Sequence, residues 1–144
     1  MADKPVRTDK ITAVEELTER FRKRWADAPI PVPDNVSVNG YLAARELFRA
    51  IERAGTTRNH EVIKALEGHV IKDNFRKYPS VIREWDHLVG QMLYLARTKK
   101  PADMKERWDM IEMIADVAPE AAAPPRELSK CKMQSLADTP VYGG

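Results

Sequence analysis

Two consecutive amphipathic segments, each ended by a glycine, constrain the fold of this chain most. Residues 38–54 predict a long helix, because their apolar side chains recur every three or four positions. Gly55 follows, and glycine readily takes the left-handed conformation that ends many helices. After a short polar turn, residues 59–67 predict a second, shorter helix that ends at Gly68. The centre of the chain is therefore predicted to be helical.

The long helix is expected to present one apolar face to a core and one charged face to water. Its predicted buried stripe consists of Tyr41, Ala44, Leu47, Phe48, Ile51 and Ala54. Its predicted solvent face consists of Arg45, Glu46, Arg49, Glu52 and Arg53. Ser37 or Asn39 could cap its first turn through a side-chain oxygen. The shorter helix is expected to bury Val62, Ile63 and Leu66.

An earlier helix is predicted over residues 11–28, with an apolar stripe of Val14, Leu17, Phe21 and Trp25. Three prolines at positions 29, 31 and 33 end it, because proline lacks an amide donor and clashes with the preceding turn. The charged residues 1–10 are expected to be disordered.

Beyond Gly68 the pattern changes to short strands. Residues 81–86 and 92–98 are β-branched or aromatic runs, and we expect them to pair as an antiparallel hairpin across residues 87–91. Residues 101–117 fit a helix through Met104, Trp108, Ile111 and Ala115, and fit a strand through the alternation of Ile111, Met113, Ala115 and Val117. Residues 118–144 are rich in proline and alanine and are expected to form a flexible tail.

Composition excludes several classes of protein. The 144 residues suit one domain, and 24 Lys+Arg against 22 Asp+Glu, with both signs interleaved, favour a solvated surface over a nucleic-acid interface. Binding to nucleic acid, suggested by the pI near 8.7, is the weakest alternative. No run of about 18–20 apolar residues is present, so we expect no membrane insertion. The first thirty residues lack the apolar core of a signal peptide, which predicts a cytoplasmic chain as written.

No enzyme is predicted, because no motif supplies a catalytic site, a cofactor site or a metal site. Asp86 and His87 are adjacent, so on a strand they would point to opposite faces, and a structural turn is the favoured interpretation. The three histidines His60, His69 and His87 have no metal-ligand spacing.

Aromatic side chains that we expect in the core are Tyr41, Trp25, Trp85 and Trp108. The single Cys131 is either an unpaired half-cystine or an inert thiol.

Several motifs occur in a fixed order. The long helix carries an aromatic near its start and ends in Ala-Ile-Glu-x-Ala-Gly; a threonine turn and a Val-x-x-Ala-Leu-x-Gly helix follow. In this sequence they are Tyr41, Ala50-Ile-Glu-Arg-Ala-Gly55, Thr56-Thr57 and Val62-Ile-Lys-Ala-Leu-Glu-Gly68. Further along stand Arg83-Glu-Trp-Asp-His87 and the run 91–98. This order over residues 12–117 resembles the C-terminal region of type I periplasmic binding proteins, the substrate-binding proteins of branched-chain amino acid ABC transporters.

The resemblance implies an α/β fold in which residues 11–117 form part of the C-terminal lobe: about three helices, two or three short strands and a tail. It favours a strand for residues 108–117. It implies a periplasmic protein that closes on an amino acid or similar polar solute and delivers it to an ABC permease. The first lobe would hold most ligand contacts, so we expect no binding by this chain alone and assign no ligand-binding residue. The alternative is an autonomous module that binds another protein, or itself, through exposed amphipathic helices.

Overall fold

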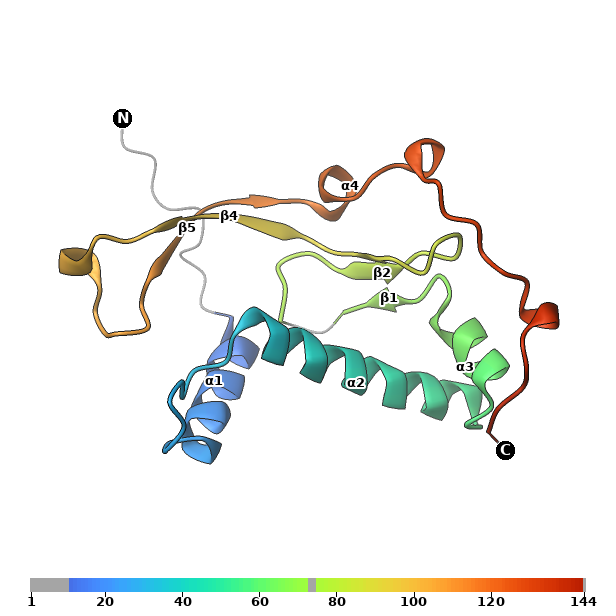
Figure 1. Cartoon of the computed structure of the whole chain (residues 1–144), viewed down its shortest axis with the longest axis horizontal. Coiled ribbons are helices and arrows are strands. Elements are labelled where there is room, and N and C mark those ends of the chain that lie inside the picture. Colours follow the sequence, from blue (N-terminus) through green and yellow to red (C-terminus); the bar gives the residue numbers. More distant parts are fainter. Residues whose placement is uncertain (1–10, 73–74, 144) are drawn as a thin grey trace.

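The computed structural model describes residues 11–72 and 75–143 (Figure 1). Three helices come first, α1 (Thr12–Arg24), α2 (Asn35–Ala54) and α3 (Asn59–Leu66). Five short strands follow, and they are β1 (Val70–Ile71), β2 (Ser80–Ile82), β3 (Val89–Gly90), β4 (Leu93–Thr98) and β5 (Ile111–Val117). A 3₁₀ turn (Pro101–Asp103) lies between β4 and β5, and the short α4 (Pro119–Ala122) and two further 3₁₀ turns complete the described chain. The mixture of helices and strands agrees with a small α/β fold, and residues 1–10 lie outside the described part.

The predicted helices are present, with shifted ends. α2 begins at Asn35 because the Asp34 carboxylate accepts a 2.7 Å hydrogen bond from the Ser37 amide. Asp34 is therefore the cap, and the expectation that Ser37 or Asn39 caps this helix was wrong. Gly55 ends α2 with φ 65°, in the left-handed region, as predicted.

The strands form two separate antiparallel sheets. In the first, β2 lies between β1 and β3. In the second, β4 pairs with β5 from Leu93 opposite Val117 to Thr98 opposite Ile111, with a register shift after Leu95. The strand predicted for residues 108–117 is thus confirmed over Ile111–Val117. All strand pairs in the described ranges are antiparallel.

The predicted hairpin between residues 81–86 and 92–98 was wrong, because the chain reverses in a tighter turn before it reaches residue 92. Backbone bonds link Arg83 to Leu88 and to His87, and His87 takes a φ of 55°. The chain therefore reverses within residues 83–88, which places β3 beside β2. β4 is then free to pair with the longer strand β5.

The core is small and lies between α2, α3 and the three-stranded sheet. Figure 1 shows β1 and β2 above α2, while the β4–β5 hairpin extends to one side, beyond α1. The buried apolar side chains of the core are Leu42, Ala50, Val62, Ile71, Ile82 and Met92. Outside this core, many large apolar side chains of the described residues are exposed, among them Val36, Phe48, Leu95 and Ile111.

The C-terminal segment runs past α3 (Figure 1), and Asn59 and His60 hold its end there. The side-chain Nδ2 of Asn59 donates to the Pro140 carbonyl at 3.0 Å. The side-chain Oδ1 of Asn59 accepts from the backbone N–H of Tyr142 at 2.8 Å. The Asn59 backbone N–H donates to the Tyr142 carbonyl at 2.9 Å, and His60 contacts Thr139. These bonds place residues 139–142 beside α3; the flexibility expected of residues 118–144 remains a prediction about motion.

Replacing Asn59 with alanine should release this segment. Two side-chain hydrogen bonds disappear, each with a net value of about 1 kcal/mol, so the Tyr142 amide should exchange with solvent roughly tenfold faster or more. Hydrogen exchange followed by mass spectrometry measures this. Asn39→Ala is the matched control, since Asn39 bonds only locally to Asn35 within α2. Equal Tyr142 exchange in both variants would contradict the contact.

Candidate functional site

The face of α2 that enters the core is not the one that the sequence predicted. Leu42, Glu46 and Ala50 are buried, whereas Phe48 is 64% exposed. The expectation that Tyr41, Ala44, Leu47 and Phe48 belong to the buried stripe was therefore wrong, and so was the expected exposure of Glu46. The reason is the position of the sheet, because β1 and β2 lie on the side of α2 that carries Glu46, across the hollow that Glu46, Ile71 and Ile82 line.

Ionic partners compensate the buried carboxylate of Glu46, which is only 5% exposed. Its Oε1 accepts a 2.8 Å hydrogen bond from Arg49 Nη1 and lies 3.6 Å from Arg45 Nε. Its Oε2 lies 3.7 Å from His69 Nε2, beyond hydrogen-bond distance. A carboxylate this far from water needs such partners, because an uncompensated buried charge is strongly destabilising. The spacing of Arg45, Glu46 and Arg49 was the only sequence signal for this cluster.

The side of α2 away from Glu46 carries an uncharged surface, which is bordered by Leu47, a residue that also lines the hollow beneath the helix, and by Tyr41, whose ring lies beside Phe75. Val36 is 77% exposed and Leu47 is 45% exposed, in addition to Phe48. We call this surface the outer face of α2, and it consists of Val36, Gly40, Tyr41, Ala44, Leu47 and Phe48. At Gly40 nothing lies within 4 Å of where a Cβ would stand, so the face has a gap there. Exposed apolar surface of this kind marks a contact site for another surface.

A hollow lies at the inner side of α2. It has a volume of about 330 Å³ and is lined mostly by apolar side chains, among them Leu42, Leu66, Ile71 and Ile82. Glu46 and Arg76 supply charged groups to its wall. The small sheet thus leaves space beneath α2 that a larger sheet would fill.

The β4–β5 hairpin is a second exposed region. Leu93, Leu95, Ile111 and Ile114 are all exposed on its two strands. A two-stranded sheet has two unpaired edges and is of marginal stability alone, so this hairpin also needs a neighbour.

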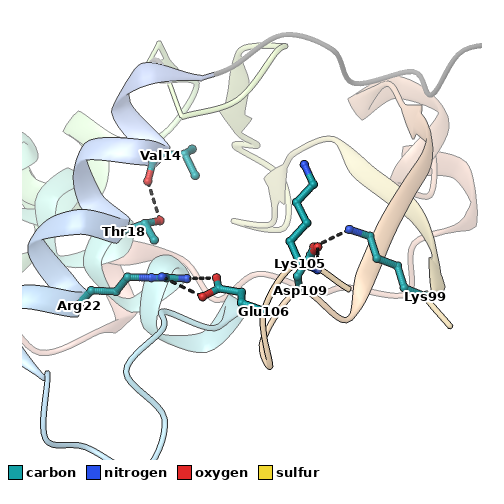
Figure 2. Close-up of polar contacts among 7 residues, drawn as sticks. All are labelled: Val14, Thr18, Arg22, Lys99, Lys105, Glu106 and Asp109. Atoms are coloured by element: carbon teal, nitrogen blue, oxygen red, sulfur yellow. Dashed lines mark hydrogen bonds and ion pairs between the residues drawn. The ribbon is translucent and has the colours of Figure 1, made fainter. Parts of the chain in front are cut away.

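Charged pairs hold the loop between these strands (Figure 2). Lys99 donates to Asp109, which also accepts from the Lys105 amide at 3.1 Å, and Arg22 of α1 pairs with Glu106. The bond from Lys99 is the main reason that the pKa of Asp109 lies below its ordinary value. An open hollow of about 870 Å³ beside this loop is lined by Arg97, Lys99, Lys100 and Lys105, with Asp103 and Glu112. The surrounding charges are of both signs, which does not build an anion site.

The adjacent pair Asp86 and His87 lies in a turn, as predicted. Asp86 Oδ1 accepts from Arg83 Nε and from the Leu88 amide, each at 3.0 Å, while His87 Nε2 lies 2.8 Å from Glu67 Oε1. The two side chains have different partners and form no dyad. The Arg83 hydrogen bonds are the largest cause that lowers the pKa of Asp86, against the opposing effect of desolvation.

The remaining candidate residues lie apart. His60 contacts Thr139, and His69 lies near Glu46. Within residues 11–72 and 75–143, no three His, Cys, Asp or Glu side chains gather closely enough to hold a metal ion. Cys131 is an exposed free thiol. Of the described helices, none is long and apolar enough to cross a bilayer.

The aromatic side chains do not all pack as expected. Trp25 is half-exposed beside Arg24, and Tyr41 lies with its ring centroid 6.1 Å from that of Phe75. The Arg45 guanidinium stands over both rings, 5.7 Å from Tyr41 and 5.0 Å from Phe75. Trp85 and Trp108 are half-buried, and Arg83 covers Trp85 at 3.9 Å. Cation–π contacts thus replace the core packing predicted for Trp25 and Tyr41.

Comparison with protein-family models, with curated proteins and with solved structures finds no match.

Leu42→Ala tests which face of α2 is buried. Leu42 lies in the core, so its truncation should lower the free energy of unfolding by about 2–4 kcal/mol. Leu128→Ala removes an equal volume from an exposed side chain and should change this free energy by less than about 0.5 kcal/mol. Urea denaturation of both variants measures the difference; similar small effects would contradict the assigned core.

Acid should destabilise the protein partly through Asp86. Because the folded pKa of Asp86 lies below its ordinary 3.8, its contribution is present above that pH and is lost as the pH falls through the folded value. Asp86→Asn should therefore lose less stability than wild type when urea midpoints are compared at pH 5 and pH 2.5. Asp27→Asn, at an exposed position, should keep the wild-type dependence. An unchanged dependence in Asp86→Asn would contradict the Arg83 contact.

Proposed function

We propose that this chain is the C-terminal segment of an ABC-transporter substrate-binding protein for amino acids or similar small polar solutes. The observation that carries the proposal is the outer face of α2, which a complete lobe would cover. Val36 and Phe48 on this face are 77% and 64% exposed, whereas large apolar side chains are usually buried in a finished domain.

The order of elements supports the same proposal. A long helix, a glycine end, a short helix and then short strands follow in the order that the resemblance implies. In that family a parallel sheet of the lobe packs against such helices, and helices usually cover both faces of a parallel sheet. The outer face of α2 is the surface that such a sheet would meet.

In the complete protein, the function would be solute capture by hinge closure between two lobes. The first lobe would supply most ligand contacts, so the chain of 144 residues would bind no solute by itself. Its role would be to complete the second lobe and to present the closed protein to a membrane permease.

A second candidate function is an autonomous module that binds another protein. The lack of charged side chains on the outer face of α2 favours this second function, since protein-binding surfaces are depleted of charged residues at their centre. This candidate needs no upstream lobe and predicts a protein partner in place of a small-molecule ligand.

Solute binding distinguishes the two candidates. We would read the DNA upstream of the Met1 codon, express any α/β lobe encoded there in frame with this chain, and titrate amino acids by calorimetry. The transport proposal predicts that the extended protein binds an amino acid and that the chain alone does not. Specific binding by the chain alone would contradict it, and the absence of an encoded lobe would favour the interaction module.

A further inference from the structure

We propose that, in the 144-residue chain, the outer face of α2 binds the same face of a second copy in an antiparallel, two-fold symmetric dimer. This inference concerns the chain in solution and does not depend on solute transport. The contact would be isologous, so each copy supplies the same residues and the interface closes on itself.

Charge does not oppose this contact. The outer face carries no ionic side chain at Val36, Gly40, Ala44, Leu47 or Phe48. Arg45, the nearest cation along the helix, turns its guanidinium onto the rings of Tyr41 and Phe75 instead. A second copy would therefore meet this face without burying an unpaired charge, which is the usual obstacle to self-association.

The shape of the face fits a second copy in one orientation. Phe48 projects from α2, and Gly40 leaves open space about 12 Å away along the helix, eight residues earlier. An antiparallel arrangement about Ala44 places Phe48 of each copy over Gly40 of the other. A parallel arrangement would oppose two Phe48 rings and leave a void at Gly40, which close packing disfavours.

The outer face offers large apolar side chains to such a contact. Val36, Tyr41, Leu47 and Phe48 are each between 39% and 77% exposed. Aromatic side chains are enriched at the buried centre of interfaces, and Tyr41 and Phe48 supply them here.

Molar mass and a point charge test the proposal. Light scattering after size exclusion at tens of micromolar protein should give about twice 16.4 kDa for wild type. Phe48→Glu should give a monomer with unchanged circular dichroism. Leu95→Glu places the same charge on the exposed surface of β4 and should leave the dimer intact. A monomeric wild type, or a dimer lost only in Leu95→Glu, would overturn the assignment.

Cross-linking tests the geometry without altering Phe48. In a Cys131→Ser background, Ala44→Cys stands at the two-fold axis and should form a disulfide-linked dimer within minutes of oxidation. Glu52→Cys lies farther along α2, away from the axis, and should remain mostly unlinked under the same conditions. Disulfide formation requires Cβ atoms about 3.5–4.5 Å apart, so equal linkage of both variants, or none in Ala44→Cys, would contradict the antiparallel contact.

Discussion

The burial of Glu46 fixes the orientation of α2, and the rest of the structure follows from that orientation. A carboxylate can face the sheet because Arg49 donates to it and Arg45 and His69 lie close by. With Glu46 inside, Leu42 and Ala50 enter the core on the same face. Phe48 then faces solvent, since a residue two positions beyond Glu46 lies on nearly the opposite side of the helix.

This orientation explains why the chain is under-packed. The core takes only small contributions from α2, and the three-stranded sheet is too narrow to fill the hollow beneath the helix. Charged pairs such as Arg22 with Glu106, and the Asn59 contacts with residues 140 and 142, connect elements that share little apolar contact. Exposed ion pairs add little stability, so the molecule depends on further cover for its apolar faces.

Local features of this fold were predictable, because nearby residues determine them. The helical period located α1, α2 and α3, Gly55 marked the end of α2, and the strand over Ile111–Val117 followed from the resemblance. What failed depends on distant residues. The face that α2 buries depends on where the sheet lies, and the pairing of β4 depends on the turn at residues 83–88. The contact of Asn59 with Tyr142 spans more than eighty positions, and no local pattern reveals it.

The most direct test of this account is the reactivity of two carboxylates on α2. Carbodiimide labelling of the unmodified protein, followed by mass spectrometry, compares Glu46 with Glu52, which lies exposed on the same helix. The account predicts that Glu52 is modified quickly and that Glu46 is modified only as the protein unfolds. Equal rates at the two positions would mean that α2 buries its apolar stripe instead, and the outer face would cease to exist as an exposed surface.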